Sequence, residues 1–140
     1  MNIVIDTSAA INSIIETPYT ETLQHHILNS AYVFAPDVYI PEVTNVLWKY
    51  YMFHNFSSDL CKTVIDKSIR LIDKIIHSNL LYKEAFKLST ITKHSTYDCY
   101  FLVLARQQDA TLLTLDKKLI QIAQENHIQV INLYNENLTQ

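Results

Sequence analysis

Residues 1–10 read MNIVIDTSAA, and this stretch places an aspartate directly after a short apolar run. The run, residues 3–5, has the all-apolar character of a strand buried on both faces of a parallel sheet. Thr7 and Ser8 follow it, and their residue types commonly begin helices. A strand that passes into a helix is the repeating unit of α/β folds. Asp6, at the junction, is either a helix cap or part of a metal site.

The same alternation of apolar runs and helical periodicity continues to the end of the chain. We expect strands over residues 3–5, 31–36, 110–115 and 128–133. Expected helices cover residues 20–30, a segment that begins at Pro41, a segment from Ser57 or Ser58 to about residue 76, and residues 81–92, 97–106 and 116–126. Apolar spacing directs Leu23, Ile27, Leu28, Val43, Val46, Leu47, Tyr50, Tyr51, Leu60, Val64, Ile65, Ile69, Ile72 and Ile76 inward.

This order predicts an α/β fold with a mostly parallel sheet of four to five strands and right-handed crossovers. Residues 1–140 then form one domain, and the block at about 41–92 is a helical excursion within it. The helix at 97–106 is apolar on nearly every face, which predicts that it is buried.

The composition is that of a globular protein, with 49% apolar and 18% charged residues. No apolar run approaches the ~20 residues that span a bilayer, and the N-terminus lacks the pattern of a secretory signal. Two cysteines without CxxC spacing suit a reducing compartment. We therefore expect a cytoplasmic protein with no membrane partner.

The chain contains no glycine. Glycine is required both in the GxGxxG turn of dinucleotide-binding folds and in the phosphate-binding P-loop, so neither motif is present and no nucleotide cofactor is expected. The six histidines are dispersed and show no metal-binding spacing. A net charge of −3 does not indicate a strongly basic nucleic-acid binder, although basic groups can still gather locally. Phosphate, if bound, must be held by side chains and metal ions.

Four acidic residues stand where a strand ends or a helix begins: Asp6, Glu42, Asp98 and Asp116. Each has a simple local explanation. Asp6 and Asp116 suit helix caps, Glu42 suits the positive end of a helix dipole, and Ser95-x-x-Asp98 resembles a capping box.

Taken together, these four acids indicate a shared site. Ligands of parallel sheets bind beyond the carboxyl ends of the strands, where Asp6 and Asp116 are expected. Two carboxylates ~4 Å apart repel by about 4 kcal/mol at an effective dielectric constant of 20. A divalent cation removes this repulsion, and an all-oxygen ligand set suits Mg²⁺ or Mn²⁺. If these side chains meet, a metal ion is the natural reason.

Four blocks of the sequence resemble the successive blocks of a PIN domain: IVIDTSAAI (3–11), APDVYIPEVTNVLWKY (35–50), STYDCYFLVLARQQDATLLTLDKKL (95–119) and IQVINL (128–133). The resemblance extends over essentially the whole chain. It is closest to small bacterial PIN-domain ribonucleases, the toxins of VapBC-type toxin–antitoxin modules.

The resemblance implies a three-layer α/β/α fold and a metal-dependent endoribonuclease. It identifies Asp6, Glu42, Asp98 and Asp116 as the catalytic, metal-binding acids, with Asp6 and Asp98 as first choices for direct ligands. It implies that Thr7, Ser8 and Thr114 support these acids. The expected chemistry is hydrolysis of RNA phosphodiester bonds by water that Mg²⁺ or Mn²⁺ activates.

Four basic residues lie near these acids in the sequence: Lys49, Arg106, Lys117 and Lys118. They could contact RNA phosphates or lie on solvated helix faces. The resemblance also implies a homodimer and an antitoxin partner that occupies an apolar groove. The aromatic residues from Trp48 onward suit either the core or the dimer interface. Asp109-Ala110 replaces the glycine that related sequences often have before the last acidic block, which changes a turn.

Two other functions are compatible with parts of this pattern. An aspartate-nucleophile phosphatase also has a strand that ends in Asp, but it needs a second acid two residues later, where this chain has Ser8. The alternative is a non-catalytic PIN-like module that binds RNA or protein.

Overall fold

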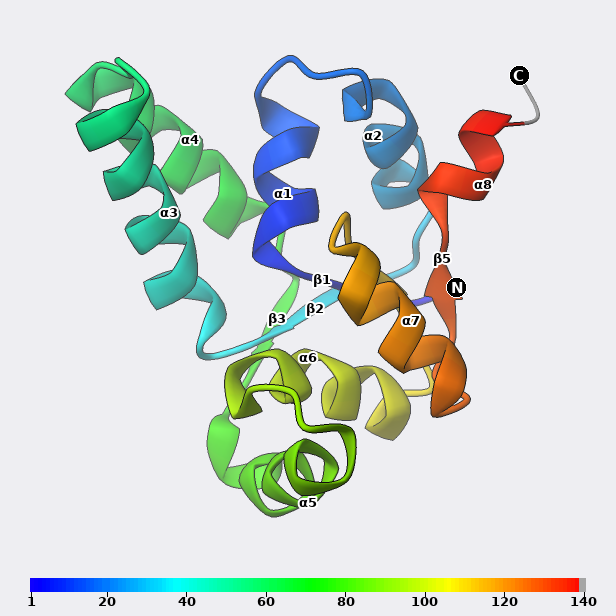
Figure 1. The fold of residues 1–140 in the computed structure, drawn as a ribbon. Coiled ribbons are helices and arrows are strands. Elements are labelled where there is room, and N and C mark those ends of the chain that lie inside the picture. The colour runs from blue at the N-terminus through cyan, green and yellow to red at the C-terminus, as the bar shows by residue number, and fades with distance from the viewer. Residues whose placement is uncertain (139–140) are drawn as a thin grey trace.

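The structure is a computed structural model that describes residues 1–138. Its centre is a parallel sheet of five strands in the order β3-β2-β1-β4-β5 (Figure 1). The strands are β1 (Ile3–Ile5), β2 (Val33–Pro36), β3 (Lys74–Ile76), β4 (Thr111–Leu113) and β5 (Val130–Ile131). Val4 of the central strand pairs with Phe34 of β2 and with Leu112 of β4. β1 is completely buried, as its apolar sequence predicts.

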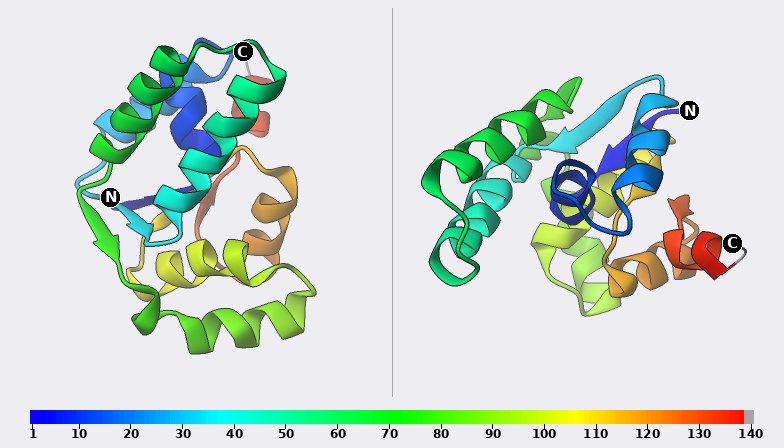
Figure 2. Two further views of the ribbon diagram at one scale, coloured as in Figure 1. Left: turned by 90° about the vertical axis from the view of Figure 1, so that its left-hand side faces the viewer. Right: turned by 90° about the horizontal axis from the view of Figure 1, so that it is seen from above.

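The helices form the two outer layers (Figures 1 and 2). On one face lie α1 (Thr7–Ile14), α2 (Thr20–Leu28), α3 (Tyr39–Phe53) and α4 (Ser58–Arg70). The opposite face carries α5 (Tyr82–Thr92) and α6 (Thr96–Gln107), which follow the short 3-10 turn η1 (Ser78–Leu80). The crossover between β4 and β5 is α7 (Lys117–Glu125), and α8 (Leu133–Leu138) follows β5. This arrangement confirms the predicted three-layer α/β/α fold.

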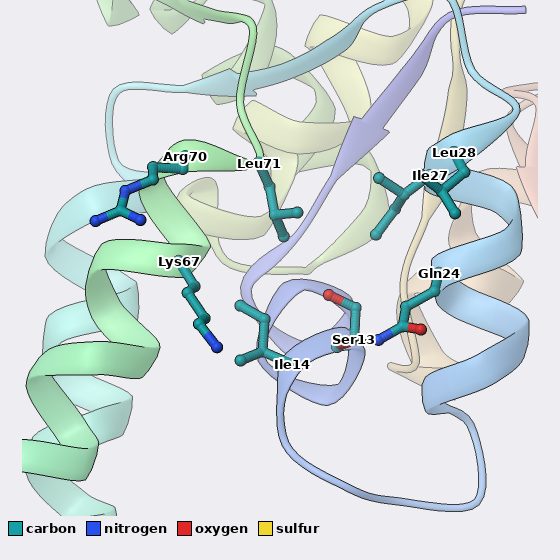
Figure 3. Close-up of a pocket in the computed structure, with 8 residues that line it drawn as sticks. All are labelled: Ser13, Ile14, Gln24, Ile27, Leu28, Lys67, Arg70 and Leu71. Atoms are coloured by element: carbon teal, nitrogen blue, oxygen red, sulfur yellow. Dashed lines mark hydrogen bonds between the residues drawn. The ribbon is translucent and has the colours of Figure 1, made fainter.

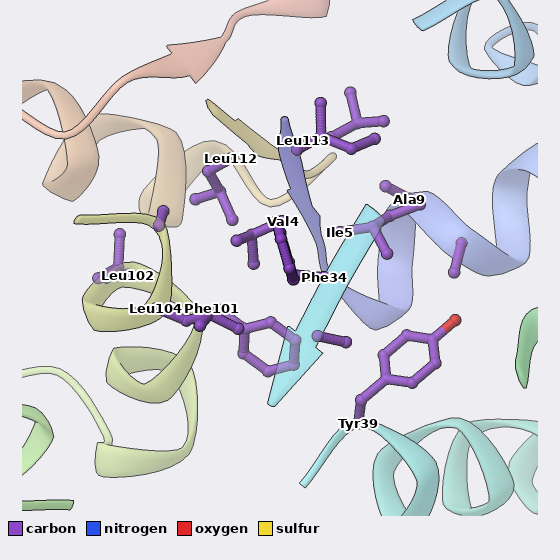
Figure 4. Packing of buried hydrophobic residues seen from close by; sticks show 14 of the residues in the cluster. Val4, Ile5, Ala9, Phe34, Tyr39, Phe101, Leu102, Leu104, Leu112 and Leu113 are labelled. Atoms are coloured by element: carbon purple, nitrogen blue, oxygen red, sulfur yellow. The ribbon is translucent and has the colours of Figure 1, made fainter. Parts of the chain in front are cut away.

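Most of the core lies between the sheet and its two helical layers. α6 is the buried helix predicted from its apolar sequence, and residues 101–105 are at most 1% exposed. Figure 4 shows the ring of Phe101 pointing toward β2. Burial of this helix fixes its first turn, which carries Asp98, beside the carboxyl edge of the sheet.

The predicted helix from residue 57 or 58 to about 76 is wrong in its last part. α4 ends at Arg70, and Lys74–Ile76 form the edge strand β3. The Asp73 amide donates a hydrogen bond to the Val33 carbonyl at 2.9 Å, and the Asp73 carboxylate accepts one from the Val33 amide at 2.8 Å. These two bonds set the register of β3 against β2.

Three side chains that the apolar spacing directs inward are exposed instead: Leu28, Tyr51 and Leu60. The reason is that α2, α3 and α4 are covered on one side only, so the apolar residues at the margins of their inner faces remain in solvent. α3 also begins at Tyr39, two residues before Pro41. The last strand is shorter than residues 128–133, because α8 begins at Leu133.

A glycine-free chain must place other residues where the backbone turns left-handed. Asn55, Lys93, Asp109 and His127 have φ between 49° and 61°, and each follows a helix closely. Asp109 precedes β4, at the turn where the family resemblance leads us to expect glycine, and its φ is 49°. Aspartate tolerates this region better than most residues, so the turn keeps a left-handed geometry without glycine. Within residues 1–138, none of the helices combines the length and apolarity needed to cross a membrane.

Candidate active site

A cavity of about 410 Å³ at the carboxyl edge of β1 contains the side chains of all four predicted acids. Asp6, Glu42, Asp98 and Asp116 reach it from the end of β1, the first turn of α3, the first turn of α6 and the residue before α7. These segments are far apart in the sequence and are brought together by the parallel sheet and its crossovers. We call this cavity the acidic pocket.

Asp6 both caps a helix and faces the acidic pocket. Its Oδ1 accepts hydrogen bonds from the Ala9 amide at 2.9 Å and from the Ser8 hydroxyl at 2.7 Å, which caps α1. Its Oδ2 accepts one from the hydroxyl of Thr114. The carboxylate is only 8% exposed. The two roles that the sequence leaves open for Asp6 are therefore compatible.

Ser8 and Thr114 join the segments that follow β1 and β4. The Ser8 hydroxyl accepts a hydrogen bond from the Leu115 amide at 3.0 Å, and the Thr114 hydroxyl accepts one from the Asp116 amide at 3.0 Å. Thr114 is fully buried. Because each hydroxyl contacts both Asp6 and the backbone beyond β4, the position of Asp6 is tied to that of Asp116.

Glu42 lies in the first turn of α3, where its charge complements the helix dipole. The hydroxyl of Thr7 donates a hydrogen bond to its Oε1 at 3.1 Å. Ser8 and Thr114 therefore contact Asp6, and Thr7 contacts Glu42.

Asp98 and Asp116 are each engaged on one oxygen. Asp98 Oδ2 lies 2.8 Å from Nε2 of His94, an ion-pair distance, although the imidazole is not aligned for a hydrogen bond. Asp116 caps α7, and its Oδ1 accepts hydrogen bonds from the amides of Lys118 at 2.9 Å and Leu119 at 3.3 Å.

The acids of the pocket influence one another electrostatically. Burial raises the pKa of Asp6 from 3.8 to about 6; hydrogen bonds from Thr114, Ala9 and Ser8 oppose this change, and the charge of Asp116 adds to it. Burial likewise raises the pKa of Glu42 from 4.5 to about 7, with further contributions from the charges of Asp98 and Asp6. Burial and mutual repulsion therefore both disfavour the ionised forms of Asp6 and Glu42.

Among the side chains that the structure describes, no three His, Cys, Asp or Glu residues form a group that could hold a metal ion in this arrangement. Each acid of the pocket is instead turned toward its own donor. In the described part of the chain, Glu42 Oε2, Asp98 Oδ1 and Asp116 Oδ2 accept no hydrogen bond. Free carboxylate oxygens and mutual repulsion suit a hard divalent cation, so the donor set fits Mg²⁺ or Mn²⁺ chemically.

The four predicted basic residues lie in different places. Lys49 lines the acidic pocket. Arg106 forms an ion pair with Glu84 at 3.2 Å in another cavity. Lys117 Nζ lies 4.7 Å from the ring centre of Tyr134, and neither Lys117 nor Lys118 lines the acidic pocket.

Sequence reasoning missed several side chains of this site. Asn45 and Tyr50 lie on α3 three and eight residues after Glu42 and line the same pocket. Asn12 lies one helical turn after Ser8 on α1, and His94 lies four residues before Asp98. Helical spacing from the four acids could have found them, but Tyr50 reads as a core residue and His94 as one of six dispersed histidines.

The chain belongs to the PIN domain family, whose sequence pattern matches residues 3–125. This match covers the strand–helix segment that carries Asp6 and extends through α7, so all four acids lie within it. Among curated proteins, none has a sequence that matches this chain significantly.

Solved structures share the fold at low sequence identity. PAE2754 from Pyrobaculum aerophilum superposes with a TM-score of 0.70 at 17% identity, over 87% of this chain and 79% of that one. The structure of VapBC2 from Rickettsia felis, bound to a DNA fragment from its promoter, superposes with a TM-score of 0.64 at 17% identity. The match covers 94% of this chain and 98% of that one. VapC20 from Mycobacterium tuberculosis, described as a sarcin–ricin loop cleaving toxin, superposes with a TM-score of 0.64 at 15% identity. The match covers 85% of this chain and 93% of that one.

Proposed function

We propose that this protein, as one PIN domain over residues 1–140, is a metal-dependent endoribonuclease of the VapC toxin type that acts in the cytoplasm. The observation that carries the proposal is that four carboxylates from distant segments line one pocket at the carboxyl edge of the sheet. The similarity to VapC20, described as a loop-cleaving toxin, supports this choice of reaction.

Asp6, Glu42, Asp98 and Asp116 would hold Mg²⁺ or Mn²⁺ in this pocket. When bound, such a cation lowers the pKa of a coordinated water molecule and stabilises negative charge on the phosphate. The chain's own hydroxyls fix the acids: Thr114 and Ser8 orient Asp6, and Thr7 orients Glu42. These contacts preorganise the negative groups before any ligand binds.

Lys49 is our proposed contact to an RNA phosphate, because it lines the acidic pocket and carries the opposite charge. Arg106, Lys117 and Lys118 do not line the acidic pocket, so any contact of theirs with RNA would lie outside it. A scissile phosphate between the acids and Lys49 would then meet positive charge on both sides once the cation is bound.

The test is cleavage of single-stranded RNA by the purified protein in Mg²⁺ or Mn²⁺, with and without EDTA. We expect cleavage that EDTA abolishes. Binding of RNA without cleavage under any metal condition would instead favour a non-catalytic PIN-like module.

We further propose that an antitoxin segment binds the groove between α1, α2 and α4, a cavity of about 400 Å³ (Figure 3). Ile14, Ile27 and Leu71 give it an apolar floor, and Lys67 and Arg70 of α4 lie along one side. A partner helix with apolar side chains and an acidic residue complements this groove. The similarity to the VapBC2 complex supports a protein partner.

Leu28 allows a direct test of this groove, because it lines the cavity and is 83% exposed, so its replacement should not disturb the core. Leu28→Glu should abolish co-purification with a co-expressed antitoxin. Leu80→Glu, at an exposed position outside the groove, is the matched control and should retain the partner. Equal retention by both variants would contradict the proposed groove.

We also propose a homodimer in which the C-terminal end of α3 forms the interface. Trp48, Tyr51, Met52 and Phe53 are each more than half exposed there, and the rings of Trp48 and Phe53 lie 6.2 Å apart. An exposed aromatic patch of this kind is typical of an interface rather than of a solvent-facing helix.

A further inference from the structure

The acidic pocket changes its chemistry along its length. All four carboxylates lie where the strands end and the helices begin. The later turns of α1 and α3 also line the pocket, and they contribute no acidic residue. There the lining consists of Asn12, Asn45, Lys49 and Tyr50, with Ile11 and Val46 between them. The pocket is therefore divided into a carboxylate end and an end without carboxylates, to which Lys49 contributes a positive charge.

The helical repeat gives the separation of these two ends. Tyr50 lies eight residues after Glu42 on the same face of α3, which corresponds to about 12 Å along the helix at 1.5 Å per residue. A phosphate held at the carboxylate end would therefore leave the adjoining part of the same nucleotide chain beside Asn45 and Tyr50.

The side chains at the end without carboxylates suit a nucleobase. Tyr50 is partly buried, and edge-on contacts with Phe56 at 5.0 Å and His54 at 5.5 Å between ring centres hold its ring. Asn12 lines the pocket, and its Nδ2 donates a hydrogen bond to the Ser8 carbonyl at 2.8 Å, while no described residue donates to its Oδ1. Asn45 is exposed at the pocket and offers an amide donor and acceptor.

We propose that the end of the acidic pocket between α1 and α3 is a subsite for one unpaired nucleobase. The base stacks on Tyr50 and hydrogen-bonds through Asn45, and Lys49 contacts a neighbouring phosphate. The inference rests on the proposed function, because it assumes that the carboxylate end receives the scissile phosphate. A base in a double helix cannot reach such a wall, so the substrate is single-stranded at this point.

The first test is independent of cleavage. Isotopically labelled protein is titrated with each of the four nucleoside 5′-monophosphates, and with ribose 5-phosphate as a probe without a base. Amide and side-chain NMR signals of Asn12, Asn45 and Tyr50 should shift with the nucleotides and not with ribose 5-phosphate. Equal shifts with both probes would show a phosphate site only and would overturn the inference, as would the absence of shifts at these residues.

Variants then separate stacking from packing. Tyr50→Leu should weaken nucleotide binding about tenfold, while Tyr50→Phe retains it. Tyr32→Leu is the control, since Tyr32 is an exposed tyrosine with one aromatic neighbour, Phe34, at the amino end of β2. The melting temperature of Tyr50→Leu, compared with those of wild type and Tyr50→Phe, shows whether its fold is intact. Equal binding by Tyr50→Leu and Tyr32→Leu would contradict the subsite.

Failure of the proposed function would be distinguishable from failure of the subsite. If the protein cleaves no RNA but binds nucleotides in this base-dependent way, the subsite stands and the nuclease proposal fails. If it cleaves RNA but Tyr50→Leu has the kcat/KM of wild type on single-stranded RNA, the nuclease proposal stands and the subsite fails.

Discussion

The hydroxyl of Thr114 donates a hydrogen bond to the carboxylate of Asp6, although the two residues are 108 positions apart in the sequence. The bond joins the residue that follows β1 to the segment that follows β4, its neighbour in the sheet. Because the same hydroxyl accepts a hydrogen bond from the Asp116 amide at 3.0 Å, it positions two of the four acids at once.

Replacement of Thr114 should therefore impair catalysis as well as stability. Thr114→Val leaves the Asp116 amide and the buried Asp6 oxygen without this partner, which should lower the free energy of unfolding by about 1–3 kcal/mol. We expect RNA cleavage to fall at least tenfold, because the site loses an orienting contact. Thr114→Ser keeps the hydroxyl and is the control for both measurements. Wild-type cleavage by Thr114→Val would mean that the Asp6 orientation is unimportant.

The strand-to-helix junctions were predictable from the sequence because their chemistry is local. The apolar run at residues 3–5, a polar cap and helical periodicity all belong to adjacent residues, and the same holds for residues 110–126. The four acids could be found in this way because each stands after a strand or in the first turn of a helix. Their meeting in one pocket also depends on the strand order, which the sequence did not predict.

β3 illustrates what local patterns could not reveal. Ile69, Ile72 and Ile76 have spacings of three and four residues, which continue the helical period of α4. Their real environment is set by the pairing of residues 74–76 with β2, a contact between distant segments. The contact between His94 and Asp98 was hidden because it depends on the orientation of both side chains. The cap that Asp116 provides for α7 was predictable, because it involves adjacent residues only.

The metal-free protein should lose stability as the pH rises from about 4 to about 7. The pKa of Asp6 is about 6 and that of Glu42 about 7 in the folded protein, both above their ordinary values of 3.8 and 4.5. In this window the folded state retains protons that the unfolded chain has released, so ionisation favours unfolding. Buried Asp6 alone contributes about 3 kcal/mol, Glu42 adds to this, and the effect is complete above pH 7.

Urea unfolding in EDTA at pH 5 and pH 8 measures this effect. We expect a smaller difference in the free energy of unfolding between pH 5 and pH 8 for Asp6→Asn than for wild type. The double variant Asp6→Asn/Glu42→Gln should show a smaller difference still. Mg²⁺ or Mn²⁺ should stabilise wild type more at pH 8 than at pH 5, because the ligands must be ionised. If the free energy of unfolding changes from pH 5 to pH 8 by the same amount in wild type and in the double variant, the raised pKa values of Asp6 and Glu42 are refuted.

His94 should influence metal binding through Asp98, since Nε2 lies 2.8 Å from Asp98 Oδ2. His94→Leu removes a side chain that fixes one oxygen of that carboxylate, and we expect a loss of about tenfold in Mn²⁺ affinity. Titration calorimetry measures the affinity directly. His77→Leu is the matched control, because His77 lies 3.9 Å from Asp37 and outside the acidic pocket. Equal affinities of the two variants would exclude a role for His94.

The exposed aromatic patch at the end of α3 should determine the oligomeric state. Phe53→Glu places a charge on a side chain that is 68% exposed, so the fold should be retained while a homodimer dissociates. Sedimentation velocity of wild type and variant measures the change from dimer to monomer. Phe86→Glu makes the same change at a 65% exposed position on α5 and should leave the dimer intact. Dissociation by Phe86→Glu alone would place the interface on α5.

Cleavage of single-stranded RNA by wild type and by Asp6→Asn in Mn²⁺ tests the four-carboxylate site most directly. Asparagine keeps the size of the side chain and an oxygen that can cap α1, so the variant should fold, as its circular dichroism and melting curve would show. We predict that wild type cleaves, that EDTA stops it, and that Asp6→Asn loses at least 100-fold in rate, as expected for loss of a charged group from the catalytic site. Cleavage by folded Asp6→Asn at the wild-type rate would contradict the account.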